Sequence, residues 1–264
     1  MKLSSVSSKT KIRHNNGINE TFRNLPLPAK RVMFLVLGQV DSKKLIPREQ
    51  PYRIYASEYA KICELDQSTA YKQLKSAVEQ LQSQLLTIPK KEILAPFARA
   101  GDPLWKRPEG NGVRMLNVTE YCDYEVDSGY IDVVFTKQME PYISKIAGNY
   151  TSQILLSAAR LNNSHSSNLY QLIRENISKK KTHYFDISLN DLKMHLGVYV
   201  DKDNYNYPQY KDFNKFVIKR NIPVIEKETE IKDINVEIIG RKGRKASELR
   251  ISYRIDDQMK FTDF

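Results

Sequence analysis

Four cations close to the C-terminus form the part of the sequence best suited to binding chemistry. Residues 240–245 read Gly-Arg-Lys-Gly-Arg-Lys. A tight turn needs only residues such as asparagine and glycine, whereas guanidinium and ammonium groups bind phosphate oxygens or enter a minor groove. We therefore predict phosphate or minor-groove contacts from this tip, and the alternative is a loop that only adds solubility. The four cations are Arg241, Lys242, Arg244 and Lys245.

No comparable pattern for catalysis occurs. A nicking nuclease needs two histidines around one apolar residue to hold a metal beside a nucleophilic tyrosine, but the four histidines stand at positions 14, 165, 183 and 195. The chain has no Gly-x-x-x-x-Gly-Lys-Ser/Thr stretch for nucleotide phosphates. Cys63 and Cys122 lack a metal-like spacing and are interpreted as small buried residues. We expect no enzyme activity, no metal and no cofactor.

The residues on either side of the cationic tip predict the secondary structure that carries it. Residues 234–239 precede the tip, and Leu249, Ile251, Tyr253 and Ile255 alternate with polar residues after it. A period of two with one apolar face is typical of half-buried strands. The tip is therefore expected at the end of a β-hairpin.

A helical pattern in the first half indicates a second binding element. Residues 52–56 predict a short strand, a helix then runs to Cys63, and residues 64–67 form a turn. The next helix has Ala70, Leu74, Ala77, Val78 and Leu81 on one face, which leaves Ser68, Thr69, Lys72 and Lys75 on the other. This order is that of a helix-turn-helix, whose second helix enters a major groove. A plain pair of surface helices is the alternative.

The segments that follow extend this pattern to a winged helix. Residues 86–94 and 113–136 predict strands, separated by a loop at 95–112 that is rich in proline, glycine and charge. A helix-turn-helix followed by a strand hairpin is a winged helix, so the prediction no longer depends on one motif. Pro28 also suits the first turn of a helix that runs to about Gly38, and because this helix is apolar on almost every side, we expect it to be buried.

The second half of the chain repeats the same order. Residues 182–194 resemble residues 51–62, because in both an aromatic strand leads into a helix, and Ser188 and Asp191 have the spacing of a capping box. A second recognition helix is expected to begin near Lys211, with Phe213, Phe216 and Val217 facing inward and with Lys211, Asn214, Lys215 and Lys219 outward. Pro223 is expected to kink or split this helix.

The bulk composition agrees with a polyanionic partner. Lysine and arginine total 42 against 31 acidic residues, a net charge of +11. The longest apolar run, at 32–37, is far shorter than a membrane span, so we expect a cytoplasmic protein. Residues 1–20 predict a flexible basic arm, in which Lys11 and Arg13 either contact phosphate or belong to a solvated tail.

At this point several motifs resemble one family. They read KTKIRH at 9–14, LPLPAKRVM at 25–33, AYKQLK at 70–75, EPYIS at 140–144, SNLYQLIR at 167–174 and GRK at 243–245. In this order they resemble the π-type plasmid replication initiators of the Rep superfamily, whose members carry two winged helices. The resemblance covers nearly the whole chain, and a set of motifs in one order is more specific than any single one.

The resemblance implies a bacterial protein that binds iterons, the repeats at a plasmid origin, and that recruits host replication proteins such as an initiator, a helicase or a primase. It also implies a monomer–dimer equilibrium, in which the dimer represses its own promoter at an operator with an inverted repeat. The implied base readers are Lys211, Asn214, Lys215 and Lys219, with supporting contacts from Ser68, Thr69, Lys72 and Lys75. Relatives often carry arginines directly after the Asp-Phe pair, where this chain has Asn214 and Lys215.

We therefore predict an α+β protein of two tandem winged-helix domains related as a pseudo-repeat. The expected divisions are an arm at 1–20, an N-terminal domain at 21–147 and a C-terminal domain at 148–264. The two recognition helices are expected to enter successive major grooves of double-stranded DNA, about one helical turn apart. A purely regulatory repressor is the main alternative, and a pair of protein-interaction modules is a third interpretation.

Overall fold

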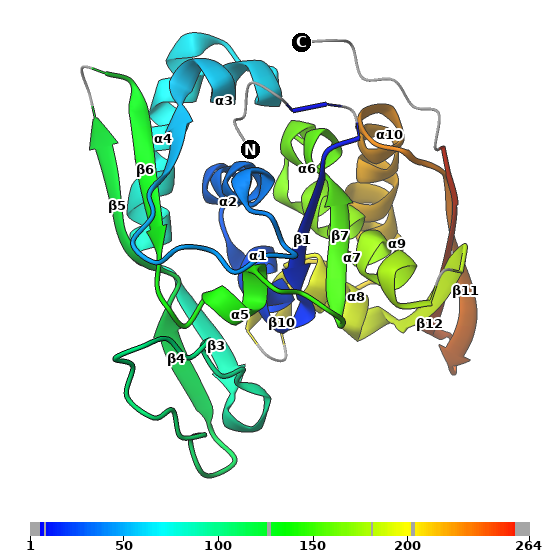
Figure 1. Ribbon diagram of the computed structural model, residues 1–264. Helices are drawn as coiled ribbons and strands as arrows, with labels where there is room; N and C mark the ends of the chain where they lie inside the picture. The colour runs from blue at the N-terminus through cyan, green and yellow to red at the C-terminus, as the bar shows by residue number, and fades with distance from the viewer. Residues whose placement is uncertain (1–5, 8, 126–127, 181, 202–203, 257–264) are drawn as a thin grey trace. The chain divides into compact units, whose positions relative to one another are not determined.

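The computed structural model describes residues 6–7, 9–125, 128–180, 182–201 and 204–256 (Figure 1). The chain divides into two compact units, Met1–Leu155 and Leu156–Asp263. Each unit combines several helices with small antiparallel sheets. This mixture agrees with the predicted α+β class.

A buried helix organises the first unit. Residues 29–38 of α2 (Leu27–Gln39) are all buried, because the helix is apolar on nearly every side. Helices α3 (Ala56–Cys63) and α4 (Gln67–Gln82) follow one another through a turn in which Glu64 adopts the left-handed conformation, with φ 53°. Helix α4 packs against both α2 and α3. The predicted helix-turn-helix is therefore present.

Two small sheets accompany these helices. Strands β2 (Tyr52–Tyr55), β6 (Tyr130–Phe135) and β5 (Thr119–Glu125) form one sheet in the order β2-β6-β5. Strands β3 (Leu85–Pro89) and β4 (Val113–Asn117) form a separate hairpin. The strand predicted at 86–94 ends early, at Pro89, and a 3₁₀ turn follows at Lys90–Glu92.

The prediction of a flexible arm at 1–20 is wrong from Lys11 onward. Residues 11–15 form β1 (Lys11–Asn15), which pairs antiparallel with β7 (Tyr150–Ile154). His14 is buried, and its Nε2 lies 2.8 Å from Oδ1 of Asn19 at the start of α1 (Asn19–Asn24). The segment is ordered because it joins a sheet and buries its alternate residues. Residues 1–5 and 8 lie outside the described part of the chain.

The same strand pair moves the boundary between the units. Strand β7 follows the boundary predicted at 147/148, yet it belongs to the first unit because its hydrogen-bonding partner is β1. The short helix α5 (Glu140–Ile143) precedes it in the same unit. The structural division therefore falls later, between Leu155 and Leu156.

The second unit begins with helices and ends with a sheet. Helices α6 (Leu155–Arg160) and α7 (Ser164–Lys180) precede β8 (Tyr184–Ser188) and α8 (Leu189–His195). The predicted cap of α8 is present, because the Asp191 N–H donates to Oγ of Ser188 at 3.0 Å. Strands β11 (Ile231–Lys242) and β12 (Lys245–Ile255) form the long hairpin, and the sheet order is β11-β12-β8. Two short strands, β9 (Tyr199–Asp201) and β10 (Asn204–Tyr205), also pair.

A buried carboxylate joins the helices of this unit to the hairpin. Glu230 directly precedes β11 and is 2% exposed. Its oxygens accept hydrogen bonds from Oγ of Ser157 at 2.6 Å, from the Tyr170 hydroxyl at 3.0 Å and from Nη1 of Arg174 at 3.0 Å. A buried charge is tolerated when several donors surround it. Glu230 therefore fixes the start of the hairpin against α6 and α7.

The recognition helix of the second unit is continuous but irregular. It consists of α9 (Tyr210–Phe213), a π-helical turn (Asn214–Ile218) and α10 (Lys219–Glu228). Pro223 does not split this helix, because α10 runs through that position, and the kink expected there stays a prediction. Pro223 is exposed, so its ring needs no space in the core. The irregular turn lies before the proline.

Candidate nucleic-acid interface

The start of α4 is held by its cap. Asp66 accepts hydrogen bonds from the Thr69 N–H at 2.9 Å and from its hydroxyl at 2.6 Å. These bonds, first the one from the hydroxyl and then the one from the backbone, lower the pKa of Asp66 below its ordinary value. A charged cap at the N-terminus is also favoured by the helix dipole. The first turn, which would approach a nucleic acid, is therefore rigid.

The inward face of α4 is anchored to two other helices. Ala70, Leu74, Ala77 and Leu81 are fully buried, while Val78 is half-buried. In addition, Oε1 of Gln73 accepts from the Tyr59 hydroxyl of α3 at 2.8 Å and from Nη1 of Arg31 of α2 at 3.1 Å. Burial raises the pKa of Tyr59, so this hydroxyl keeps its proton for the bond.

Of the four residues predicted on the outward face of α4, three are exposed to solvent. Ser68, Lys72 and Lys75 are exposed, whereas Thr69 is half-buried and its hydroxyl is bonded to Asp66. In the described part of the chain, neither Lys72 nor Lys75 forms an ion pair. The two lysines can therefore reach phosphates, and Thr69 acts first as part of the cap.

The recognition helix of the second unit presents a row of lysines. Lys211, Lys215 and Lys219 are exposed and Asn214 is half-buried, while Phe213 and Val217 face inward as predicted. The inward assignment of Phe216 is wrong, because this side chain is 45% exposed and Ile218 is buried instead. The reason is the π turn, in which the Lys219 N–H donates to the carbonyl of Asn214, five residues back.

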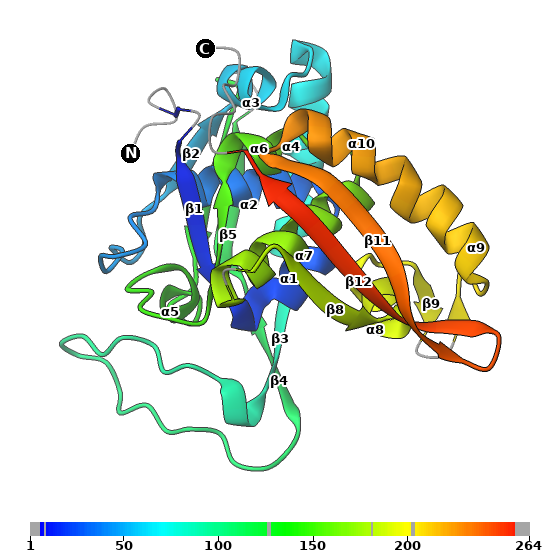
Figure 2. The same ribbon diagram turned by 90° about the vertical axis from the view of Figure 1, so that its right-hand side faces the viewer.

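The wing is the hairpin of β11 and β12. Its strands are joined by Gly243 and Arg244, and Gly243 has a φ of +61°, which a hairpin turn with glycine in its first central position requires. Strand β8 pairs with β12 only from Glu248 to Ser252, so the tip extends beyond the third strand (Figure 2). All four tip cations are exposed: Arg241, Lys242, Arg244 and Lys245.

A groove joins the wing to the start of the recognition helix. It has a volume of about 710 Å³ and lies between α8, α9 and the hairpin. The residues that line it include Lys211 of the helix and Arg241, Arg244 and Lys245 of the tip. Four of the predicted residues, far apart in sequence, are thus brought to one concave surface. Lys215 and Lys219 lie further along the helix, outside the groove lining.

Ion pairing distinguishes two groups of cations in the second unit, those with a carboxylate partner and those without. Nε of Arg250 lies 2.7 Å from Asp186, and Nε of Arg254 lies 2.7 Å from Asp233. Within the residues that the structure describes, the four tip cations and the three helix lysines have no carboxylate partner. Unpaired cations on a shared concave surface favour a polyanion. The groove therefore has the charge and shape to bind a nucleic acid.

The structure also places residues that the sequence analysis either missed or assigned to an arm. Arg220 is exposed on the recognition helix beside Lys219, and Asn190 and Gln209 line the groove. An exposed arginine next to a predicted lysine was the available signal for Arg220. Lys11 is exposed on β1, whereas Arg13 is half-buried with its guanidinium 5.4 Å from the centre of the Tyr150 ring.

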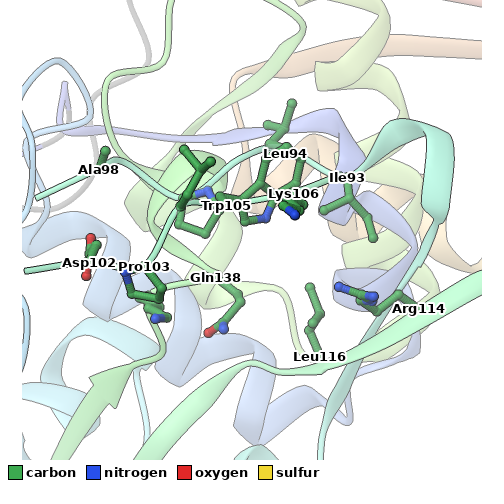
Figure 3. Close-up of a pocket in the computed structure, with 13 residues that line it drawn as sticks. Ile93, Leu94, Ala98, Asp102, Pro103, Trp105, Lys106, Arg114, Leu116 and Gln138 are labelled. Atoms are coloured by element: carbon green, nitrogen blue, oxygen red, sulfur yellow. The ribbon is translucent and has the colours of Figure 1, made fainter. Parts of the chain in front are cut away.

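A cavity of about 440 Å³ in the first unit also has room for a ligand. Figure 3 shows Leu94 and Trp105 on one side of an open centre and Leu116 and Arg114 on the other. The lining is largely apolar, and its one carboxylate, Asp102, is bound to Arg48. The lining contains no pair of a nucleophile and a base.

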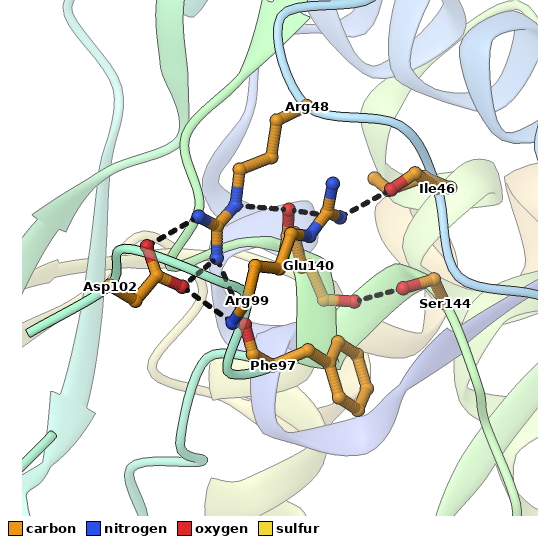
Figure 4. Close-up of polar contacts among 7 residues, drawn as sticks. All are labelled: Ile46, Arg48, Phe97, Arg99, Asp102, Glu140 and Ser144. Carbon is orange, nitrogen blue, oxygen red and sulfur yellow. Dashed lines mark hydrogen bonds and ion pairs between the residues drawn. The ribbon is translucent and has the colours of Figure 1, made fainter. Parts of the chain in front are cut away.

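An ion cluster explains how the loop around this cavity is held (Figure 4). Arg48 donates to both oxygens of Asp102 at 2.6 and 2.7 Å, to Oε1 of Glu140 at 3.0 Å and to the carbonyl of Phe97 at 2.9 Å. Arg99 donates to the same Glu140 oxygen at 2.8 Å. The bonds from Arg48 lower the pKa of Asp102 to about 2. The cluster therefore fastens the loop to the body of the first unit.

Two further findings concern metals and membranes. Across the described ranges, no three histidine, cysteine or acidic side chains are grouped so that they could hold a metal ion. None of the helices in those ranges combines the length and the apolar character that crossing a bilayer requires.

Comparison with known proteins identifies relatives along most of the chain. The family described as "Initiator Replication protein, WH1" matches residues 11–174, and the one described as "Initiator Rep protein, WH2" matches residues 188–253. The PI protein of Escherichia coli is 37% identical over 260 residues, which are 96% of this chain and 85% of that protein. A replication initiation protein of Escherichia coli is 20% identical over 214 residues, 80% of this chain and 58% of that protein.

A solved structure is similar as well. The crystal structure of the Pi initiator protein in complex with iteron DNA matches with a TM-score of 0.83 and 35% sequence identity. The match covers 96% of this chain and 100% of that one. The two winged-helix domains predicted from the sequence are therefore confirmed.

Proposed function

This chain belongs to the family of initiator replication proteins with two winged-helix domains, and we propose that it initiates replication of a plasmid by binding the iterons of its origin. The family is the one predicted from the sequence motifs. The proposal is supported by the similarity to a Pi initiator that was crystallised with iteron DNA.

The groove of the second unit is the observation that carries this proposal. Lys211 on the recognition helix and three cations of the wing line the same surface without carboxylate partners in the described residues. A protein that neutralises phosphates in this way binds DNA through release of counterions. A helix that begins at such a surface can then read base edges in the major groove.

Each group of residues has a separate proposed role. Residues on the recognition helix of the second unit read bases: Lys211, Asn214, Lys215 and Lys219. The tip cations of the wing contact phosphates: Arg241, Lys242, Arg244 and Lys245. The first unit adds contacts to the phosphate backbone of the DNA, made on α4 by Ser68, Thr69, Lys72 and Lys75 and on β1 by Lys11 and Arg13.

The proposed mechanism needs no chemical step in the protein. Binding bends the origin DNA, at an elastic cost of about 1 to 6 kcal/mol that added contacts offset. The distorted origin is then opened with host replication proteins, such as an initiator, a helicase or a primase. A monomer–dimer equilibrium would allow a dimer to repress its own promoter. Since plasmid origins lie in the bacterial cytoplasm, that is the compartment we propose.

Two experiments test this function at different levels. Selection from a library of random duplexes, followed by footprinting, should yield a preferred site; equal retention of all sequences would refute specific binding. The protein supplied in trans should then support replication of a plasmid that carries the preferred sites at its origin. A preferred site without replication would favour the second candidate, a purely regulatory repressor, because both activities use the same DNA-reading surface.

A further inference from the structure

We propose that Phe216 reads thymine by contacting its C5-methyl group in the major groove. This inference rests on the proposed function, and it adds a residue that periodicity had placed in the core. The observation behind it is an aromatic side chain that is 45% exposed on the recognition helix, with the exposed cations Lys215, Lys219 and Arg220 close by in the sequence.

The π turn is what directs Phe216 outward. In a regular α-helix, a residue three positions after the buried Phe213 would lie about 60° from it and share its face. Here the bond from the Lys219 N–H to the Asn214 carbonyl spans five residues. Ile218 therefore returns to the inward face and is 1% exposed. Phe216 is rotated away from the core by the extra residue in the turn.

Phe216 is nevertheless held in place. Its ring stacks on that of Tyr207, with centroids 6.2 Å apart and an interplanar angle of 27°. The backbone at Tyr207 is fixed in turn by buried Lys193 of α8, whose Nζ donates to the carbonyls of Tyr207 at 2.7 Å and of Pro208 at 3.3 Å. An aromatic side chain with only two rotatable bonds loses little further entropy when it binds.

The surroundings decide which partner fits this side chain. Exposed cations next to it favour a polyanion over an apolar protein surface or the interior of a membrane. The major groove of DNA offers one apolar group, the C5-methyl of thymine, and side chains such as phenylalanine contact it. The remaining exposed part of Phe216 therefore matches a thymine within the site that the lysines read.

The test uses the full chain and a duplex that carries its preferred site. Each thymine in turn is replaced by deoxyuridine, which lacks only the C5-methyl group, and Kd is measured at constant salt. For the unaltered protein we expect about fourfold weaker binding at one or two positions, the factor for one methyl-sized group. Phe216→Ala should lose this ratio at the same positions, and Phe216→Leu should keep it in part.

Met194→Ala provides the matched control. Met194 is 52% exposed on α8 of the same unit, but it lies outside the recognition helix. This variant should keep the full thymine-to-uracil ratio. Thermal unfolding of Phe216→Ala checks that the helix remains folded, and Phe216→Leu keeps the test decisive if the alanine variant unfolds.

The possible outcomes distinguish a failure of this inference from a failure of the proposed function. If the unaltered protein selects a site but Phe216→Ala and Phe216→Leu retain every thymine preference, the inference is wrong and the proposed function stands. If the unaltered protein selects no site, both are wrong. Loss of the ratio at particular thymines in Phe216→Ala, with partial retention in Phe216→Leu and full retention in Met194→Ala, supports the inference.

Discussion

Removing two cations from the wing tip should reduce the salt dependence of DNA binding by a definite amount. The perturbation is the double variant Arg244→Ala with Lys245→Ala. Both side chains are exposed, line the groove beside Lys211 and have no ion-pair partner in the described residues. Because they are remote from the core of the unit, the variant should fold normally.

The magnitude follows from the number of unpaired cations. Among the described residues, eight cations are proposed to contact phosphates: the four of the wing tip, Lys72 and Lys75 of α4, and Lys11 and Arg13 of β1. With about 0.9 counterions released per contacted phosphate, log affinity should fall with log salt at a slope near minus seven. Loss of two contacts should change that slope by about two units. Between 50 and 200 mM salt, the loss of affinity should then shrink from about 10⁴-fold to about 10³-fold.

The assay is a titration of duplex DNA by fluorescence anisotropy at several salt concentrations. The matched control is Lys227→Ala with Arg254→Ala, which also removes two positive charges from the second unit. Both of these side chains already face a carboxylate, Glu228 at 3.0 Å and Asp233 at 2.7 Å. Arg254 also lies near the far end of β12, about 30 Å from the tip at the rise of an extended strand. The control should keep the original slope.

Two results would refute this reasoning. An unchanged slope in the tip variant would mean that the wing contacts no phosphates. An equal change in the tip variant and in the control would mean that net charge, not position, sets the salt dependence. In either case the groove would lose its proposed role.

Three further predictions test other parts of the molecule. Lys215→Ala should lower discrimination at one or two base pairs by about 1 to 3 kcal/mol in competition binding, and equal losses on random DNA would count against base reading. Burial, followed by repulsion from Arg23, lowers the pKa of Lys30 to about 7. Since the unfolded chain then binds more protons between pH 7 and 9, the free energy of unfolding should rise over that range by up to about 1.4 kcal/mol per pH unit. Denaturant titrations should show a weaker dependence of this free energy on pH for Lys30→Met. Hydrogen bonds from Arg48 lower the pKa of Asp102 to about 2, so the contribution of Asp102 to stability is present above pH 4 and is lost as the pH falls toward 2. Asp102→Asn should therefore lower the thermal midpoint at pH 6 and reduce the fall of that midpoint in acid. If the midpoint of the variant falls with pH as steeply as that of the unaltered protein, this ion cluster is not a source of stability.

Local patterns in the sequence were sufficient to predict the helices and the hairpin that carry the candidate DNA-binding residues. The spacing of Ala70, Leu74, Ala77 and Leu81 predicted α4, and alternation around the tip predicted the wing. Such patterns are reliable because they record which face of a single element is buried. The order of the motifs also identified the family, since that order depends on the chain alone.

Other features required the tertiary structure, because they join segments that are distant in sequence or depend on a local change of helix geometry. Strand β1 is ordered by β7, which lies far along the chain, and no property of residues 11–15 names that partner. The exposure of Phe216 follows from one π turn, which periodicity at 3.6 residues cannot anticipate. The groove exists because the hairpin returns beside the recognition helix and places Arg244 near Lys211. The sequence by itself therefore determined where the candidate binding elements lie and what charge they carry, and packing decided which side chains share a surface.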